Sequence, residues 1–257
     1  MKILEQYNLK GKTAIITGAG DGIGRGSALK LAEAGADVVC SDLDLEKAKA
    51  TAEMAAAFGV RALAVKCNVT IEEDMKELVN ETVRNFGKVN ILVNNAGGGG
   101  GGTEKLEELT MDYITFVYKL NVFSTFTMMR LCAPHMRKDG YGSIINISSM
   151  ASNMVSHNMS VYGSSKAAIN QLTKYAAYDL GPEIRVNAIG PGAIRTRALA
   201  TVLTPEIEEK MLKNTPIKRL GETEDIAEAV LYFASPASSW TSGQVIFVNG
   251  GGVQELD

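Results

Sequence analysis

The glycine-rich stretch TGAGDGIG, Thr17–Gly24, decides the fold expected of this chain. It follows a compact apolar run and opens a helical pattern over 23–34, the context that a nucleotide-binding turn requires. Gly18, Gly22 and Gly24 permit a tight turn and a close approach of backbone to phosphate, and the helix supplies free N–H groups there. The stretch therefore predicts a seat for a nucleotide pyrophosphate. Its spacing, G-x-x-x-G-x-G, leaves a plain strand–helix turn as the alternative.

Short β-rich runs alternate with longer helical patterns along the chain. The expected strands cover residues 13–17, 37–41, 61–67, 89–93, 143–147, 184–189 and 244–248. The expected helices cover 23–34, 45–58, 71–86, 111–137, 161–180 and 224–234, the fourth with a bend near Pro134. This alternation indicates parallel βαβ units, and the nearly continuous apolar strands indicate covered faces. We expect one α/β domain over 1–257, a Rossmann-type, doubly wound, parallel seven-stranded sheet with helices on both faces.

Composition excludes several classes of protein. With 46% hydrophobic and 21% charged residues, the chain is typical of a globular protein, and its formal charge of −3 gives no sign of a nucleic-acid partner. No apolar run is long enough to span a membrane, and residues 1–12 lack an apolar signal core, so we expect a cytoplasmic protein. We predict no metal site, because neither the three cysteines nor His135 and His157 stand at ligand spacing.

Asp42 ends the second expected strand, 18 residues after Gly24. An acidic residue at this spacing can accept hydrogen bonds from the adenosine ribose, and its charge repels a 2′-phosphate. Asp21, inside the glycine stretch, adds a second negative charge. We therefore predict NAD rather than NADP as the cofactor. The alternative is that Asp42 only caps the helix over 45–58, for which Asp44 is the better placed residue.

Tyr162 and Lys166 stand one helical turn apart on one face of the helix expected over 161–180. A phenol has a pKa near 10, and we expect a fixed ammonium group beside it to lower that pKa. Such a tyrosine can remove a proton from an alcohol while a hydride leaves the same carbon. Ser148 and Ser149 close the fifth strand, where a hydroxyl could donate to the substrate oxygen, and the residues alone do not choose between them.

Six consecutive glycines, Gly97–Gly102, follow the fourth expected strand. Parallel sheets bind ligands beyond the carboxyl ends of their strands. A loop without side chains at that edge lets a bulky substrate or cofactor approach the backbone closely. The alternative is a flexible connection with no role in binding.

Together these motifs resemble the short-chain dehydrogenase/reductase family over essentially the whole chain. The matching segments are T-G-x-x-x-G-x-G at 17–24, N-N-A-G at 94–97, Asn121, Ser149, Y-x-x-x-K at 162–166 and Pro191-Gly192. The resemblance implies that Tyr162 is the acid/base, that Lys166 tunes its pKa and binds the nicotinamide ribose, and that Ser149 donates to the substrate oxygen. It also implies that Asn121 holds a water in a proton relay and that Thr196 contacts the carboxamide.

The resemblance also predicts which residues bind the cofactor. They are Gly18, Gly22, Ile23, Gly24, Asp42, Leu43, Asn68, Val69, Asn95, Tyr162, Lys166, Pro191, Gly192, Ile194 and Thr196. One departure is Asn68, which stands where the family usually has an aspartate that contacts adenine. An asparagine can still accept and donate there, so we expect at most a modest effect on NAD affinity.

Within the family, residues 14–24, 92–100, 120–124, 205–220 and 242–256 resemble those of the bacterial 7α-hydroxysteroid dehydrogenases, which act on bile acids. This implies a homotetramer that interconverts a secondary hydroxyl and a ketone on a steroid, with the 7α-hydroxyl as the first choice. Residues 152–155 depart from the group's pattern beside the site, which leaves C12 and C3 as alternative positions. A 3-oxoacyl-carrier-protein reductase, a sugar-alcohol dehydrogenase and a non-catalytic nucleotide-sensing protein are the other candidates.

A rigid sterol needs a broad apolar slot. We expect substrate contacts from Gly99, Ser149, Met154 and Tyr162. Adaptable apolar side chains for such a slot are Met150, Met154, Met159, Leu199, Val202 and Met211, with ordinary core positions as the alternative. We expect residues 193–218 to form a lid that orders over bound substrate, because its amphipathic part places Ile207, Met211 and Leu212 on one face.

Overall fold

A computed structural model of the chain describes residues 3–99, 105–200 and 203–252. Its centre is one parallel sheet with the strand order β3-β2-β1-β4-β5-β6-β7. The strands are β1 (Thr13–Thr17), β2 (Asp37–Asp42), β3 (Ala62–Lys66), β4 (Ile91–Asn94), β5 (Gly142–Ile147), β6 (Ile184–Pro191) and β7 (Val245–Val248). The predicted doubly wound, seven-stranded sheet is therefore confirmed, and the order reverses between β1 and β4.

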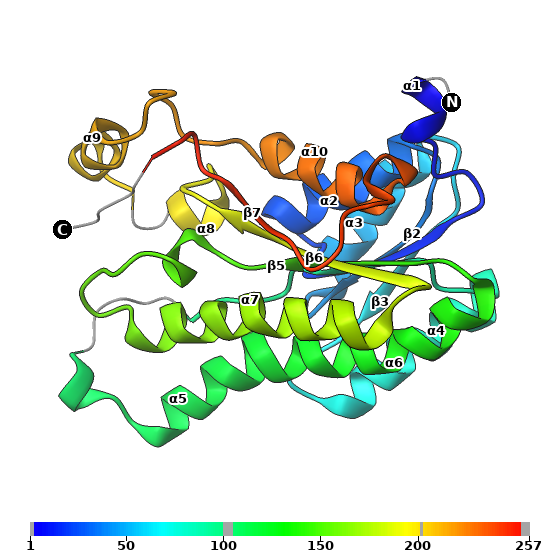
Figure 1. The fold of residues 1–257 in the computed structure, drawn as a ribbon, viewed down its shortest axis with the longest axis horizontal. Helices are drawn as coiled ribbons and strands as arrows, with labels where there is room; N and C mark the ends of the chain where they lie inside the picture. The colour runs from blue at the N-terminus through cyan, green and yellow to red at the C-terminus, as the bar shows by residue number, and fades with distance from the viewer. Residues whose placement is uncertain (1–2, 100–104, 201–202, 253–257) are drawn as a thin grey trace.

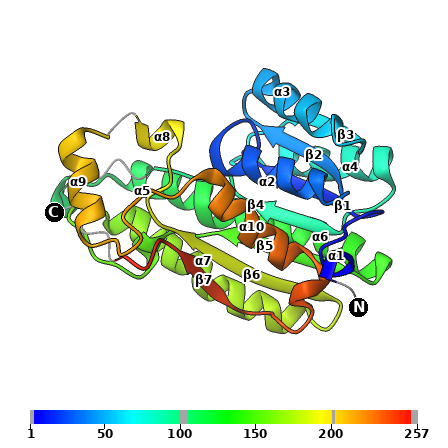
Figure 2. The ribbon, with the colours of Figure 1, turned by 90° about the horizontal axis from the view of Figure 1, so that it is seen from above.

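Helices cover both faces of this sheet (Figures 1 and 2). They are α1 (Ile3–Gln6), α2 (Gly22–Glu33), α3 (Leu45–Ala56), α4 (Glu72–Phe86), α5 (Met111–Tyr118), α6 (Ser124–Asp139), α7 (Ser160–Leu180), α8 (Arg197–Ala200), α9 (Pro205–Lys213) and α10 (Thr223–Ala234). Helices α2, α3 and α10 pack on one face and α4, α6 and α7 on the other. Successive strand residues such as Ile15 and Ile16 enter opposite core layers, which explains why the strands are apolar throughout.

The long helix expected over 111–137 is interrupted, but not where its proline stands. Helix α6 continues through Pro134, which removes only one backbone hydrogen bond, and ends at Asp139. The irregularity lies instead in the π-helical turn η2 (Lys119–Phe123), between α5 and α6. Such turns are frequent at functional sites, and this one carries Asn121.

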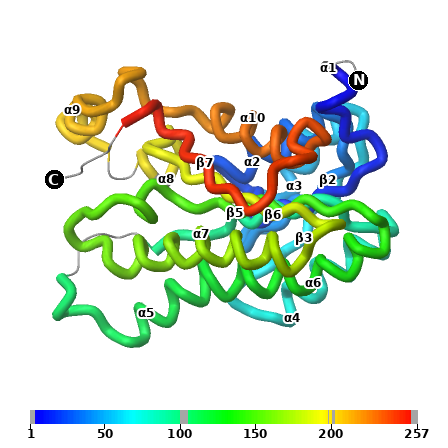
Figure 3. The backbone as a smooth tube through the Cα atoms, viewed as in Figure 1, coloured from blue at the N-terminus to red at the C-terminus, as the bar shows by residue number. Residues whose placement is uncertain are grey.

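The segment after β6 contains two short helices, α8 and α9, at one end of the molecule (Figure 3). Met211 of α9 is buried, and Ile207 and Leu212 are half-buried, as the amphipathic pattern predicts. Val202, expected in the apolar slot, lies outside the described residues, as do Gly100–Gly102 of the glycine run. Within the described chain, no helix has the length and apolarity needed to cross a membrane.

Candidate active site

The glycine stretch forms the turn between β1 and α2 at the carboxyl edge of the sheet. Asp21 caps α2, and its Oδ1 accepts a hydrogen bond of 2.8 Å from Gly22 N. Gly18 has a φ of +65°, in the left-handed region that favours glycine. A Cβ on Gly24 would overlap the carbonyl oxygen of Gly18, so only glycine fits there. The turn is therefore closed by backbone packing, as a phosphate seat requires.

Asn95 ties the end of β4 to this turn. Its Nδ2 donates to the carbonyl oxygens of Thr17 at 2.9 Å and Gly18 at 3.0 Å. Its backbone N–H donates to Thr17 Oγ1 at 3.1 Å. The turn chemistry of Asn95 thus fixes the shape of the glycine seat from a neighbouring strand.

Asp42 also holds the glycine turn and does not cap α3. Its Oδ2 accepts from Gly20 N at 2.9 Å, and its Oδ1 accepts from Asp44 N at 3.0 Å. Asp44 caps α3 by accepting from the backbone N–H groups of Glu46 and Lys47. Of the two acidic residues, Asp44 is therefore the cap of α3, and Asp42 is not.

Arg25 is a residue of this region that the sequence reasoning missed. Its guanidinium donates to Gly20 O and to Thr51 Oγ1, and it lies 4.0 Å from the Asp21 carboxylate. The spacing of Asp21 and Arg25, four apart at the start of a helix, was the available signal. Arg25 partly balances the negative charge on which the prediction of NAD rests.

Asn68 and Val69 follow β3 beside β2. Asn68 Oδ1 accepts from the N–H of Thr70 at 3.0 Å and from its hydroxyl at 2.8 Å. This oxygen is committed to a local turn, which leaves the Nδ2 group of Asn68 to meet a ligand. Val69 is buried, and Leu43, at the end of β2, is 62% exposed.

Tyr162 and Lys166 lie in the first turns of α7, as predicted. Lys166 Nζ donates to the carbonyl oxygen of Ile147 at 2.9 Å and lies 5.7 Å from the centroid of the Tyr162 ring. Lys166 is the one buried charged side chain in the described chain, and this burial lowers its pKa to about 8. At neutral pH the Lys166 side chain is therefore mostly protonated, and its positive charge lies beside the phenol.

The expected lowering of the tyrosine pKa is wrong in its net direction. Burial raises the pKa of Tyr162 above its ordinary value of 10, and a hydrogen bond with Ser149 opposes that rise. Removal of water from the phenol disfavours the phenolate more than its neighbours favour it. The sequence pattern indicates which groups are adjacent, but not how deeply they are buried.

The two serines after β5 have different environments. Ser148 is buried and donates to the carbonyl oxygen of Lys166 at 3.2 Å. Ser149 precedes the short turn η3 (Met150–Ser152), and its Oγ accepts from Ala151 N at 3.2 Å. The hydroxyl proton of Ser149 is therefore available to a partner, whereas that of Ser148 is already used.

Asn121 joins the loop after β4 to α7 from the π-helical turn. Its Nδ2 donates to Gly98 O and to Ser165 Oγ, both at 3.0 Å, and its Oδ1 accepts from Gly98 N at 2.9 Å. A Cβ on Gly97 would lie 2.8 Å from Asn121 Oδ1 and 3.1 Å from Lys166 Nζ. The first glycine of the run therefore leaves room for Asn121 and Lys166.

Comparison with known proteins fits this arrangement. Residues 18–252 match the family described as "Enoyl-(Acyl carrier protein) reductase". The 7α-hydroxysteroid dehydrogenase of Escherichia coli K12 is 49% identical over 254 residues, with 98% of each chain covered. The chain belongs to the short-chain dehydrogenase/reductase family. The 3-oxoacyl-[acyl-carrier-protein] reductase of Staphylococcus epidermidis is 37% identical over 243 residues, covering 93% of this chain and 98% of the relative.

Solved structures of this family have the same fold. A 7α-hydroxysteroid dehydrogenase complexed with NADH and 7-oxo glycochenodeoxycholic acid matches with a TM-score of 0.96 at 49% identity, covering 100% of both chains. An NADPH-dependent 3-quinuclidinone reductase from Rhodotorula rubra matches with a TM-score of 0.91 at 30% identity, covering 97% of this chain and 94% of that one. The fold is thus shared by relatives that differ in cofactor and substrate.

The loop after β6 brings further family positions to the glycine turn. Thr196 lies over Gly22, since a Cβ on Gly22 would be 3.4 Å from the Thr196 methyl group. Ile194 is buried and forms a bridge with Gly221. Pro191 ends β6, and Gly192 N donates to Val248 O at 3.0 Å. The carboxyl ends of β1, β4, β5 and β6 therefore meet around one site in this short-chain dehydrogenase/reductase fold.

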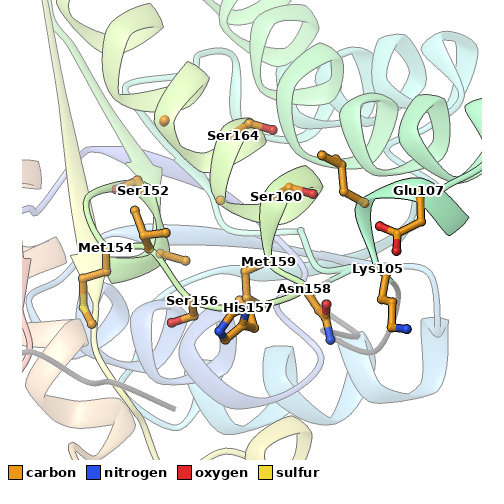
Figure 4. A pocket seen from close by; sticks show the side chains of 15 residues that line it. Lys105, Glu107, Ser152, Met154, Ser156, His157, Asn158, Met159, Ser160 and Ser164 are labelled. Atoms are coloured by element: carbon orange, nitrogen blue, oxygen red, sulfur yellow. The ribbon is translucent and has the colours of Figure 1, made fainter. Parts of the chain in front are cut away.

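Four of the residues expected in the apolar slot lie in two different places. Met154 and Met159 line a cavity of about 590 Å³ beside the start of α7 (Figure 4). Its α7 residues, among them Gly163 and Ala167, lie on roughly the opposite face of the helix from Tyr162. Met150 and Met211 are buried in the protein, as the alternative of ordinary core positions predicts. Gly99 has a φ of +89°, and its carbonyl oxygen accepts from Tyr113 Oη at 2.5 Å.

Proposed function

We propose that the protein is an NAD-dependent oxidoreductase that interconverts a secondary hydroxyl and a ketone on a bile acid, at the 7α position. The observation that carries this proposal is the convergence of Ser149, Tyr162 and Lys166 at the sheet edge that also holds the glycine turn. The 49% identity to a 7α-hydroxysteroid dehydrogenase over nearly the whole of both chains supports the substrate class.

Four residues of the site each have a separate role in the proposed reaction. The chemistry that NAD supplies when bound is acceptance of the hydride from the carbinol carbon. Tyr162 takes the hydroxyl proton, and the charge of Lys166 favours the phenolate that does so. Ser149 donates its hydroxyl proton, which faces Tyr162 without substrate, to the substrate oxygen when substrate is bound, and we assign Asn121 to holding a water that returns the proton to solvent.

The preference for NAD rests on Asp42. Its carboxylate stands at the end of β2 with both oxygens turned toward backbone N–H groups, and a 2′-phosphate beside it would be repelled. Gly18, Gly22, Ile23, Gly24, Leu43, Asn68, Val69, Asn95, Pro191, Gly192, Ile194 and Thr196 complete the proposed groove. Specificity constants measured with both cofactors test this proposal, and a preference for NADP would refute it.

The position of attack is tested with two substrates. Cholate and deoxycholate differ in one hydroxyl, so a 7α enzyme reduces NAD with cholate and leaves deoxycholate unchanged. Turnover of both would move the assignment to C12 or C3. Turnover of neither, with activity on a 3-oxoacyl thioester or a sugar alcohol, would favour the second candidate, which the 37% identity to a 3-oxoacyl-carrier-protein reductase supports. Nucleotide binding without any turnover would indicate a sensing protein.

We propose that four copies assemble in the cytoplasm. Large apolar side chains are exposed along the α5, η2, α6 and α7 region: Phe116, Phe123, Phe126, Tyr175 and Tyr178. An exposed stripe of this kind is typical of an interface between subunits. Light scattering tests the assembly, and a wild-type monomer would exclude it.

We also propose that residues 193–218 form a lid over bound substrate. Crystals with and without substrate test this proposal, and equal order of α9 in both would exclude the lid.

A further inference from the structure

Ser152 and Asn170 form a chain of hydrogen bonds that ends on Ser149. Ser152 Oγ donates to the carbonyl oxygen of Ser149 at 2.6 Å, and Ser152 N donates to the same oxygen at 3.0 Å. Asn170 Nδ2, from the third turn of α7, donates to Ser152 Oγ at 2.8 Å. Since the single hydroxyl proton of Ser152 is given to Ser149, Ser152 can only accept from Asn170.

This chain acts on a turn whose position matters for the proposed chemistry. Turn η3 packs against α7 at Gly163, where a Cβ would lie 2.9 Å from the carbonyl oxygen of Ala151. The turn begins directly after Ser149, whose hydroxyl faces Tyr162. The same helix therefore carries Tyr162 and, through Asn170, the support of the serine that faces it.

Asn170 makes this bond at a cost. Its Oδ1 is buried and has no hydrogen-bond partner among the described residues. A buried unsatisfied oxygen disfavours the folded state, so an apolar residue would be expected here if packing alone mattered.

We propose that Ser152 and Asn170 are positioning residues that hold turn η3 so that the Ser149 hydroxyl meets Tyr162 and the substrate oxygen. The inference rests on the proposed function, because it gives the pair a role in alcohol oxidation. Neither residue touches the reacting atoms; both act through the backbone of Ser149.

The test compares Ser152→Ala with the wild type in steady-state oxidation of cholate across pH. We expect kcat/KM to fall about 3- to 10-fold, the size of one lost buried hydrogen bond, with KM for NAD unchanged. Because the bond from Ser149 favours the phenolate, its misplacement raises the pKa of Tyr162 and moves the acidic limb of the profile to higher pH. Ser152→Thr keeps the hydroxyl and is expected to restore both values.

Asn170→Leu gives a second arm of similar size that adds no charge. The change removes the donor to Ser152 Oγ, so the Ser152 hydroxyl loses the partner that orients it toward the Ser149 carbonyl oxygen. We expect the same pH shift as in Ser152→Ala, and a double variant no worse than the single one.

Thr173→Val is the matched control. It removes a buried hydrogen bond of 3.0 Å from Asn146 Nδ2 to the same helix, but this bond does not reach η3. We expect a lowered Tm with an unmoved acidic limb. The inference is overturned if Ser152→Ala keeps full kcat/KM, or if it and Thr173→Val change the profile alike.

A titration of phenolate absorbance separates this inference from the proposed function. The difference between the wild type and Tyr162→Phe reports the pKa of Tyr162 without any substrate. A wild type that oxidises no bile acid refutes the proposed function. A Ser152→Ala variant that leaves the tyrosine pKa unchanged refutes the positioning role, whichever substrate the enzyme uses.

Discussion

The proposed cofactor side and the proposed substrate side of the site are built differently. Around the glycine turn, Thr17, Asp42 and Asn95 each bond to backbone from another strand or turn, and the glycines are fixed by close packing. Residues 153–160, by contrast, form no side-chain hydrogen bond with other described residues, and Val155 is 96% exposed. The proposed cofactor seat is therefore held by close packing, whereas residues 153–160 can change without disturbing the fold.

Gly24→Ala is expected to have the largest effect on NAD affinity, because it disrupts the packing of the glycine turn. Its Cβ would overlap the Gly18 carbonyl oxygen and approach Asn95 Nδ2, so the turn must open. We expect NAD affinity to fall by about 100-fold or more, because the backbone N–H groups leave the phosphate. Titration calorimetry and a thermal melt measure both effects.

Gly26→Ala is the control on the same helix. Its Cβ would lie 3.2 Å from the Cβ of Thr223 on α10, away from the glycine turn, so we expect nearly normal NAD affinity and a slightly lowered Tm as α10 shifts to make room. Wild-type NAD affinity in Gly24→Ala would show that the turn is not the cofactor seat.

Lys166→Met tests how much the buried charge of Lys166 lowers the free energy of unfolding. Burial lowers the lysine pKa to about 8, against 10.5 in the unfolded chain. Between these values the unfolded chain holds more protons, so the free energy of unfolding of the wild type rises with pH. Below pH 8 the buried charge costs about 3 kcal/mol, offset in part by its bond to Ile147.

We therefore expect Lys166→Met to lose activity and yet gain stability at pH 7. The gain should shrink steadily as the pH rises from 8 toward 10.5, as urea unfolding at several pH values would measure. A gain in stability that does not depend on pH would contradict the lowered pKa of Lys166. The buried cysteines titrate alike in both proteins, so their contributions cancel in the difference between the two free energies of unfolding.

Asp42→Ala is expected to have an intermediate effect, larger on the use of NAD than on the use of NADP. The change removes the acceptor of Gly20 N and the charge that repels a 2′-phosphate. We expect the specificity constant for NAD to fall by about 10- to 100-fold while that for NADP falls less. Asp44→Ala removes a helix cap, costs about 1 kcal/mol of stability and should leave the cofactor preference unchanged.

Met154→Asn, in the segment 153–160, is expected to have the smallest effect on stability. Met154 is half-buried beside the cavity. We expect the ratio of specificity constants among bile acids to change by about 3- to 10-fold. The free energy of unfolding should move by no more than about 0.5 kcal/mol, as for other surface positions. A large loss of stability with an unchanged ratio would place Met154 in the core instead.

The sequence predicted the rigid side well, because its signals are local. The strands, the glycine turn and the pair Tyr162–Lys166 follow from periodicity and spacing within one βα unit or one helix. Arg25, Ser152 and Asn170 were missed because their partners depend on how separate elements pack. The tyrosine pKa was predicted in the wrong direction for the same reason, since burial is a property of the whole fold.

The π-helical turn around Asn121 illustrates a further limit. Nothing in the sequence of residues 111–137 distinguishes an uninterrupted helix from one that widens at 119–123. Pro134, the residue expected to bend the helix, does not interrupt α6. The side chain of Asn121 in that turn bonds to both backbone groups of Gly98 in the glycine loop after β4. Such a feature becomes visible only when both segments are placed together.

Tyr162→Phe in cholate oxidation with NAD, followed by the absorbance of the reduced nicotinamide, tests whether this phenol is the acid/base group. We expect kcat to fall by about 100- to 10,000-fold while NAD still binds, because proton removal is lost and the cofactor seat is intact. A variant that keeps wild-type kcat would contradict the assignment of this phenol as the acid/base group.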